Sequence, residues 1–560
     1  MSFEPQSAPD RESLLMKPIN GQALKRLVEA SLVWLRTNQQ LVNSLNVFPV
    51  PDGDTGTNMV LTMQAAYDEI VNSPENNFGK MAHAVAHGAL MGARGNSGVI
   101  LSQLWRGFAR AVDSIDTLDE ATMAQAFAVA RDTAYKGVVR PVEGTILTVA
   151  KDIAASAAEA ISTSTIDPIT MLEVVVQAAD QSVQSTPDLL PVLKEAGVVD
   201  SGGKGLFFIL EGMLRYINGE PLDTAAAAVR PLSDMVLENT LEAIEPGQDY
   251  EVIVDFRPSD VLDLGNFYNR LEQMGTSIQV GEGDGIYRLH IHVPTENLYI
   301  PIDYTRTLGV VTKIAIENLI DQMQNGGERC DEAKPTLTPV EPGQIAVVAV
   351  SPGAGIERVF ASLGVAAIVE GGQTMNPSTQ EIIYAFENLP TDKIIILPNN
   401  KNIILTAEAA ATLTVKNVAV IPTHSVPQGL AAIMRLIPSG DFDSVVAEMT
   451  TALQDVETGE ITIATRSVEI DGVEVQEGEI IALLNDKLVL SASSLVEACF
   501  GLLEKAGADQ YELITLFYGA NIPKKEVSRI ADLIRDAYPN QAVEVQEGCQ
   551  PHYQFIIAIE

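Results

Sequence analysis

The stretch GQALKRLVEASLVWLRTNQQLVNSL, residues 21–45, places apolar side chains at helical spacing: Leu24, Leu27, Val28, Leu32, Leu35 and Leu41. Apolar residues that recur every three or four positions form one face of an amphipathic helix. Similar patterns follow at 81–113, 119–136, 144–162, 169–183 and 203–217, with no strand alternation among them. The sequence therefore predicts an all-α domain over residues 21–218, after a loose tail at 1–20.

The period of the pattern changes after a linker at 219–249. YEVIVDF (250–256) and IYRLHIHV (286–293) alternate apolar with polar residues, which is typical of half-buried strands and predicts a small α+β domain at 250–324. A second linker at 325–343 is rich in Gly, Pro and charge. Over residues 344–560 short apolar runs alternate with helical segments, which predicts an α/β region with a parallel sheet.

Composition limits the classes of partner and compartment. The 560 residues carry 36 Lys and Arg against 74 Asp and Glu, a net charge of −38, which opposes binding to a nucleic-acid backbone. No apolar run approaches the ~20 residues that cross a bilayer, and the polar start lacks a signal-peptide pattern. Cys330, Cys499 and Cys549 are too far apart to suggest a disulfide framework. We therefore expect a cytoplasmic protein.

The segment NVFPVPDGDTGTN, residues 46–58, is the strongest chemical signal. Asp52 and Asp54 flank Gly53, so the backbone can bend until both carboxylates face one point. Mg²⁺ prefers one or two carboxylates together with phosphate and water oxygens, and Asn46 can add a further oxygen. The alternative is an Asx-turn and N-cap in front of a helix at 57–70.

Three further turns precede helices: GARGNSG (92–98), GVVRPVEGTIL (137–147) and VDSGGKG (199–205). A glycine-rich turn at a helix start presents backbone N–H groups to an anion. Such a turn can also serve only to let helices pack closely. Four turns of this kind in one helical domain are compatible with a site assembled where helix ends converge.

These motifs, in this order, resemble the DhaL-type kinase domain of the dihydroxyacetone kinase superfamily. Together with GGQTMNPSTQEI, ILPNNKN and IPTHSVPQGLAA, they make the chain similar to the ATP-binding subunits of bacterial fatty acid kinases from about residue 20 to its end. The resemblance implies an all-α barrel that binds ATP through two Mg²⁺ ions held by acidic residues. Asp52 and Asp54 match the catalytic metal aspartates, whereas Asn46 stands where the dihydroxyacetone branch has a third aspartate.

The resemblance also implies which residues contact the nucleotide. The matching positions are Thr55, Gly56, Thr57, Asn58, Gly95, Asn96, Ser97, Gly98, Gly137, Thr145, Ile146, Asp200, Ser201 and Gly202. An arginine that lies near the phosphates in the family has no clean match. The basic candidates are Lys194, Arg94, Arg140 and Lys204.

His290 and His292 share one face of the strand at 286–293, close enough to converge on a metal. The alternative is a pair of half-exposed histidines on a polar sheet face. In relatives a cysteine on the partner strand completes a zinc-like site; here Ile253 takes its place, so Glu251 or Asp255 would have to substitute. We expect His83 and His87, four apart on a helix, to have packing or surface roles, and His424 to be structural or to contact a partner.

The resemblance implies phosphorylation of a fatty acid carboxylate by ATP, with the fatty acid presented by a separate DegV-like carrier protein that docks on the C-terminal region. A homodimer is compatible with the central α+β domain. Two alternatives remain: a DhaL-type nucleotide-holding subunit that passes phosphate to glycerone or another small ketone, and a non-enzymatic nucleotide-binding scaffold.

Overall fold

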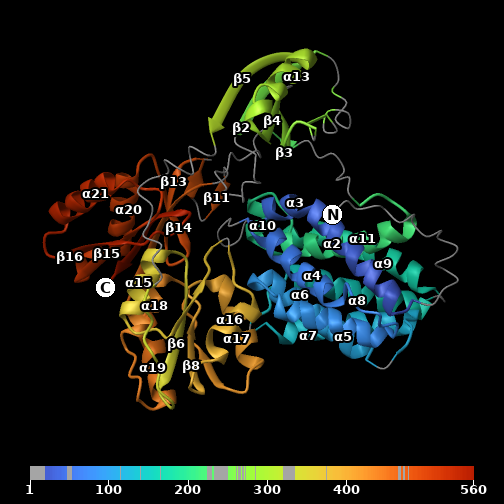
Figure 1. Cartoon of the computed structure of the whole chain (residues 1–560), viewed down its shortest axis with the longest axis horizontal. Helices are drawn as coiled ribbons and strands as arrows, with labels where there is room; N and C mark the ends of the chain where they lie inside the picture. The colour runs from blue at the N-terminus through green and yellow to red at the C-terminus, as the bar shows by residue number, and fades with distance from the viewer. Residues whose placement is uncertain are drawn as a thin grey trace. The chain divides into compact units, whose positions relative to one another are not determined.

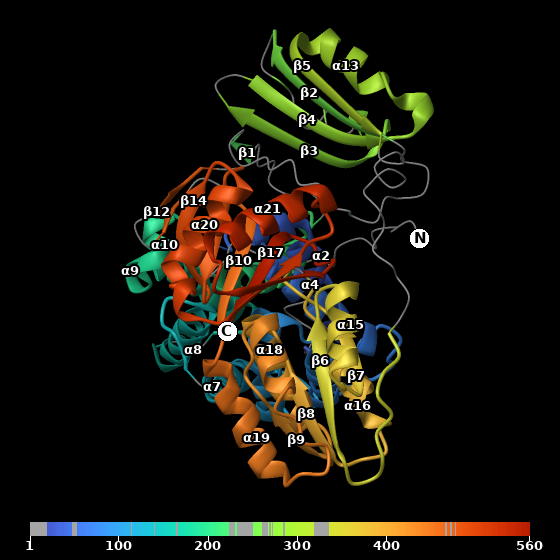
Figure 2. The same ribbon diagram turned by 90° about the vertical axis from the view of Figure 1, so that its left-hand side faces the viewer.

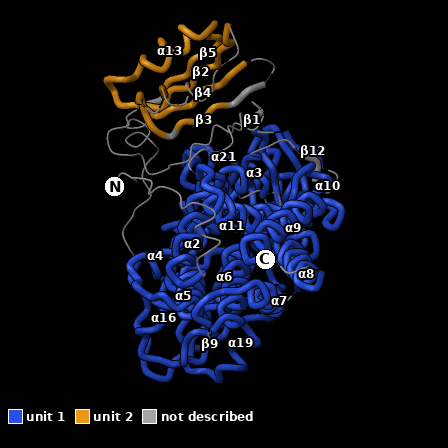
Figure 3. Tube along the Cα trace, turned by 90° about the vertical axis from the view of Figure 1, so that its right-hand side faces the viewer, with its two compact units in different colours: residues 1–223, 330–560 blue, residues 224–329 orange. Residues whose placement is uncertain are grey.

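The chain forms two compact units, residues 1–223 with 330–560, and residues 224–329 (Figure 3). The computed structural model describes residues 19–46, 53–113, 115–138, 140–163, 166–222, 230–231, 250–259, 262, 267, 270–271, 273–283, 286–318, 335–373, 375–464, 468–470, 473–476 and 478–560. Asp52, the tail up to residue 18 and most of both predicted linkers lie outside these residues. Each unit is described by itself.

The N-terminal part of the first unit is all-α, as predicted. Its helices are α2 (Gly21–Thr37), α3 (Gln39–Ser44), α4 (Thr55–Ile70), α5 (Phe78–Met91), α6 (Gly95–Ala111), α7 (Glu120–Lys136), α8 (Ile146–Thr163), α9 (Pro168–Leu189), α10 (Pro191–Glu195) and α11 (Ser201–Asn218). At several of these starts a side chain accepts first-turn N–H groups: Asn20 accepts from Ala23, and Asp167 from Ile169 and Thr170. Such N-caps define where these helices begin.

The helices pack around one aliphatic core. Their apolar faces point into it, and residues such as Val28, Leu35 and Met63 are buried there. An apolar pocket that is partly open to the surface lies among these helices, lined by residues such as Leu101, Trp105 and Ile209.

The C-terminal part of the first unit begins with a parallel sheet of order β7-β6-β8-β9. Its elements are β6 (Ile345–Ser351), α15 (Ala354–Ser362), β7 (Ala367–Glu370), α16 (Thr379–Glu387), β8 (Lys393–Leu397), α17 (Lys401–Thr412), β9 (Asn417–Val420) and α18 (Val426–Ile433), followed by α19 (Phe442–Thr451). Strand–helix alternation thus predicted this sheet correctly. Helices α16 and α17 cover the face toward the helical bundle, and α15, α18 and α19 cover the other (Figures 1 and 2).

A second, mixed sheet of order β14-β13-β10-β17-β15-β16 ends the chain. Its strands are β10 (Glu457–Ile463), β13 (Ile480–Leu484), β14 (Lys487–Ala492), β15 (Leu513–Tyr518), β16 (Ala542–Glu547) and β17 (Tyr553–Ile559); β11 (Val468–Ile470) and β12 (Val473–Val475) form a separate hairpin. Alternate residues of β17 face opposite ways. Phe555 and Ile557 pack against α20 (Leu495–Ala506) and α21 (Lys524–Ala537), whereas Ile556 packs with α18 and α19.

The second unit is the predicted α+β domain. A five-stranded sheet of order β1-β3-β4-β2-β5 is formed by β1 (Arg230–Pro231), β2 (Tyr250–Pro258), β3 (Thr276–Gly283), β4 (Ile286–Val293) and β5 (Gly309–Asn318). Helix α13 (Ile300–Leu308) packs on it, and Val252, Val254 and Leu289 lie in its core. The antiparallel register of β2 and β4 pairs Glu251 with His292 and Asp255 with Arg288.

The sequence led us to expect neither a membrane-spanning helix nor a disulfide framework, and the structure bears on both. Among the described residues, none of the helices has the length and apolar character that crossing a membrane requires. Cys549 is disulfide-bonded, and its partner lies outside the described residues; Cys499 is a free, buried thiol. The cysteine spacing gave no sign of this bond.

Candidate functional site

Four helices of the bundle begin at the same place. The hydroxyls of Thr55 at the start of α4 and Ser201 at the start of α11 lie 3.3 Å apart. Gly95 at the start of α6 lies against the Asn58 amide, and Gly202 lies against Ile146 at the start of α8. The first turn of a helix leaves N–H groups without intrahelical partners. The predicted turns therefore form one site that is rich in hydrogen-bond donors.

Asp54 is the buried carboxylate of this site, with only 6% of its surface exposed. Although it precedes α4, its side chain makes no cap hydrogen bond, which argues against the N-cap alternative. Burial raises its pKa to about 6, against hydrogen bonds from Asn58 and Asn376 that lower it. In the described part of the chain no Lys or Arg forms an ion pair with it. An uncompensated buried carboxylate of this kind fits a cation site.

Asp200 lies on the other side of the convergence and does cap its helix, because its Oδ2 accepts from Gly203 N at 2.7 Å. Burial raises its pKa to about 6 as well, against hydrogen bonds from the backbone of Gly203 and Ile146. The carboxylate thus ties the starts of α8 and α11 together. Its position beside Ser201 and Gly202 is that of the predicted nucleoside contact.

Gly95 permits a close approach between three elements. Its φ of +56° is left-handed, and a Cβ there would lie 2.6 Å from Asn58 Nδ2 and 3.3 Å from Asn376 Nδ2. Gly98 is also confined, since its Cβ would lie 2.4 Å from Thr62 Oγ1. A larger residue at 95 would displace the Asn58 and Asn376 side chains or the loop itself.

The remaining predicted residues lie at varied places around the site. The Thr57 hydroxyl faces α3, where Gln39 and Asn43 donate to it at 3.0 and 3.1 Å, and Gly56 packs against the same helix. Asn46 Nδ2 lies 3.5 Å from Asp54 Oδ1. Thr145 precedes α8, whereas Gly137 ends α7 and packs against Gln103.

Of the basic candidates, Arg94, Lys204 and Lys194 have partners within the first unit. Arg94 binds the C-terminal region, and Lys204 pairs with Asp180 at 3.5 Å while lying over the Phe207 ring. Lys194 is exposed and lies 3.9 Å from Asp188. Arg140 is exposed next to the turn before α8.

The structure adds residues that the sequence analysis did not select, at the connection between β7 and α16. Asn376 Nδ2 donates to Asp54 Oδ2 at 2.5 Å, and Arg94 Nη1 donates to the Asn376 carbonyl at 2.8 Å. Arg94 also pairs with Glu381 at 3.1 Å. The C-terminal region thus reaches the buried carboxylate of the helical domain directly.

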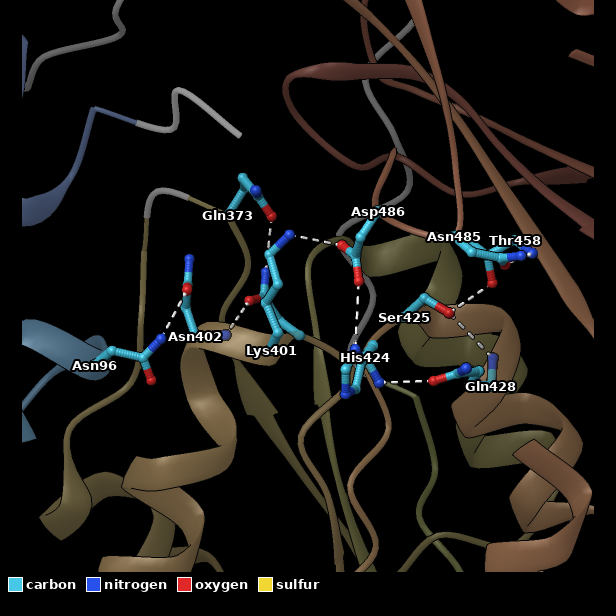
Figure 4. A network of polar contacts seen from close by, with 11 residues as sticks. Asn96, Gln373, Lys401, Asn402, His424, Ser425, Gln428, Thr458, Asn485 and Asp486 are labelled. Atoms are coloured by element: carbon cyan, nitrogen blue, oxygen red, sulfur yellow. Dashed lines mark hydrogen bonds and ion pairs between the residues drawn. The ribbon is translucent and has the colours of Figure 1, made fainter. Parts of the chain in front are cut away.

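A second polar network joins Asn96 of the helical domain to the C-terminal region (Figure 4). Asn96 Nδ2 donates to Asn402 Oδ1 at 3.2 Å, and the neighbouring Lys401 binds Asp486 at 2.7 Å. Asp486 also lies 3.3 Å from His424 Nδ1. Lys401, Asp486 and His424 line a cavity at the carboxyl ends of β6, β8 and β9, where open α/β sheets bind ligands.

The second unit holds one further candidate metal site within its described residues. Ligand atoms of Glu251, His290 and His292 all lie within 4.8 Å of one another, and all three side chains are buried. His290 Nε2 lies 3.2 Å from Glu251 but has no hydrogen-bond partner among the described residues. Burial, and then His292, lower the pKa of His290 to about 4, which leaves the ring neutral as a metal ligand must be. These residues fit a divalent cation.

The structure also separates the two carboxylates that the sequence left open. Asp255 binds Arg288 through two hydrogen bonds of 2.7 and 2.8 Å, whereas Glu251 Oε1 lies 3.2 Å from His290 Nε2, so Glu251 is the carboxylate beside the histidines. In the helical domain, His83 pairs with Asp113 at 2.7 Å and His87 with Glu69 at 3.7 Å. These two histidines therefore bind different carboxylates.

Comparisons with known proteins agree with this architecture. Three family models match in chain order: the DAK2 domain at 49–215, the middle domain of FakA-like fatty acid kinase proteins at 245–326, and the C-terminal domain of the same FakA-like proteins at 346–560. Uncharacterized proteins of Staphylococcus aureus strains MRSA252 and USA300 are each 37% identical over 554 residues, covering 98% of this chain and 100% of theirs. The chain belongs to the FakA-like fatty acid kinase family.

Among solved structures, the chain of this FakA-like protein is similar to a DegV family protein of Corynebacterium glutamicum and to DegV, a fatty acid binding protein from Bacillus subtilis. Both have 15% identity and a TM-score of 0.30, and cover 39% of this chain and 96% and 98% of theirs. A TM-score of 0.30 is too low to support an inference.

The arrangement in this family member suits a metal–nucleotide complex. N–H groups at four helix starts favour phosphate oxygens, while the uncompensated Asp54 favours a hard cation. Neither feature alone requires a nucleotide. Their convergence matches the needs of phosphoryl transfer, in which positioning and charge neutralisation supply most of the catalysis.

Proposed function

We propose that the chain is the ATP-dependent kinase subunit of a fatty acid kinase, and that it phosphorylates the carboxylate of a fatty acid presented by a separate carrier protein of the DegV type. The observation that carries the proposal is Asp54, a buried carboxylate without a cationic partner among the described residues, at the convergence of four helix starts. Mg²⁺ held by Asp54, with Asp52 and Asn46 as further ligands, would offset the phosphate charge.

The chain's own residues bind and align the substrates. The turn at 95–98 holds the phosphates, and Ile146 with residues 200–202 holds the nucleoside. A carboxylate oxygen of the fatty acid attacks the γ-phosphorus, the bond from that phosphorus to the β–γ bridging oxygen breaks, and ADP leaves. The acceptor is already ionised, so no general base is needed.

One feature supports delivery of the fatty acid by a partner. The C-terminal region contacts the buried carboxylate directly, so a carrier docked there would lie near the reaction. A homodimer stays a prediction.

The test is to incubate the full chain with ATP, Mg²⁺ and an oleate-loaded carrier, and to trap acyl phosphate with hydroxylamine as the hydroxamate. We expect ADP and hydroxamate in equal amounts, only with the loaded carrier. Asp52→Ala and Asp54→Ala should each retain less than about one hundredth of the rate, the scale for removing one group that stabilises transition-state charge. Turnover of glycerone instead would favour the small-ketone alternative, and binding of ATP without turnover of either acceptor would favour the scaffold.

A further inference from the structure

The connection between β7 and α16 is joined to the loop before α6 by several contacts. Ser378 and Arg94 form an antiparallel bridge, and Thr379 N donates to the Ala93 carbonyl at 3.2 Å. Arg94 adds its bonds to Asn376 and Glu381. Arg94 immediately precedes Gly95, where α6 begins. The position of this loop, on which the proposed phosphate contacts lie, therefore depends on the C-terminal region.

Asn376 is the residue of this connection that enters the site. Only 2% of its surface is exposed, and its Nδ2 donates to Asp54 Oδ2. Its Oδ1 is also buried but has no hydrogen-bond partner among the described residues. Buried acceptors are nearly always satisfied, so an unsatisfied one calls for a partner such as an ordered water or a bound ion.

The surroundings indicate which kind of partner is missing. Oδ1 belongs to the same amide group as the nitrogen that binds Asp54, so it lies beside a buried carboxylate that has no cationic partner in the described chain. A water molecule would satisfy the amide oxygen but would leave the charge of Asp54 uncompensated. A divalent cation satisfies both, because hard cations take carboxylate and amide oxygens as ligands.

We propose that Asn376 Oδ1 belongs to the oxygen ligands of the cation at Asp54, so that the C-terminal region completes the metal–nucleotide site of the helical domain. This inference rests on the proposed kinase function, because it assigns one more residue to the same site. On this proposal, the cation affinity of a site in the helical domain depends on Asn376, a side chain of the C-terminal region.

The test measures Mn²⁺ binding to the full chain in the presence of the non-hydrolysable nucleotide AMP-PNP, by the electron paramagnetic resonance signal of free Mn²⁺. Asn376→Ala should weaken binding about 10- to 100-fold, the scale for losing a group that supports a metal ligand. Asn376→Asp keeps an oxygen, and should bind within about threefold of wild type or more tightly. Melting midpoints in EDTA check that each variant is folded.

Glu381→Gln is the matched control for docking. Glutamine preserves the capping box that Ser378 and Glu381 form at the start of α16, but it removes the charge that pairs with Arg94. We expect Mn²⁺ affinity within about threefold of wild type.

Each outcome decides between the possibilities. An unchanged Asn376→Ala protein overturns the inference. So does an Asn376→Asp protein that binds as weakly as Asn376→Ala, or a Glu381→Gln protein that does so, because both results would assign Asn376 to docking alone. If the wild-type chain itself fails to bind Mn²⁺ with AMP-PNP, the proposed function fails too, whereas failure of the variants alone leaves that function standing.

Discussion

Replacing Asp54 with Asn should make the metal-free protein more stable while abolishing its function. Burial raises the Asp54 pKa from 3.8 to about 6, so the folded chain holds this proton more tightly than the unfolded chain. The contribution of this group to the free energy of unfolding therefore falls as pH rises from about 4 to about 6. At 1.36 kcal/mol for each pH unit between the two pKa values, the charged form costs about 3 kcal/mol at neutral pH.

The variant removes that cost but also weakens the hydrogen bonds that Asn58 and Asn376 make to a charged acceptor. We therefore expect a net gain of about 1–3 kcal/mol, seen as a melting midpoint a few degrees higher in EDTA at pH 7.5. Mg²⁺ with AMP-PNP should reverse the order, because ligand at about 1,000 times its dissociation constant stabilises only the wild type, by about 4.1 kcal/mol.

Asp188 is exposed, so Asp188→Asn serves as the control. Its melting midpoints in EDTA and with Mg²⁺ and AMP-PNP should both equal those of the wild type. An Asp54→Asn protein that melts below the wild type in EDTA would refute the idea that this carboxylate is an uncompensated charge. Equal stabilisation of variant and wild type by Mg²⁺ with AMP-PNP would refute its role as a cation ligand.

Three further outcomes are expected. Elemental analysis should find one tightly bound divalent cation, zinc before others, for each chain; Glu251→Ala should lose it, and Asp255→Asn should keep it because Asp255 binds Arg288. Neither change should slow phosphoryl transfer, and a slowed Glu251→Ala protein that is still folded would contradict the separation of the two sites. A fragment of residues 21–218 should be helical by circular dichroism and bind Mg²⁺·ATP more weakly than the full chain, since it lacks Asn376, and it should not phosphorylate carrier-bound fatty acid; full activity would show that the C-terminal region is dispensable. Burial raises the pKa of Cys499 to about 12, so iodoacetamide at pH 8 should label it only after denaturation, and rapid labelling of the native chain would place this thiol at the surface.

Local patterns predicted much of this fold because periodicity reports which face of an element is buried. The helical domain and the strands β6 to β9 were readable in this way. Periodicity does not report which distant segments touch. The contact of Asn376 with Asp54 joins residues 322 positions apart, and the segment GGQTMNPSTQEI around Asn376 was informative only through its family resemblance.

The sequence could not decide which carboxylate joins the two histidines, for a different reason. Glu251 and Asp255 lie on the same strand face, so the sequence allowed either to join the histidines. Strand register decides, since β4 sets Arg288 opposite Asp255 and His292 opposite Glu251. Register depends on pairing with another strand and cannot be read from one strand alone.

The division of the first unit between the two ends of the chain has a consequence for biosynthesis. A ribosome adds about 5–20 residues each second, so Asn376 leaves it some tens of seconds after Asp54, from which it is separated by 322 positions. During that interval the helical domain can fold, but its carboxylate has no asparagine from the later segment beside it. On the proposed mechanism, a chain that ends before Asn376 would hold nucleotide poorly. Phosphorylation would therefore begin only after Asn376 has been translated and has reached Asp54.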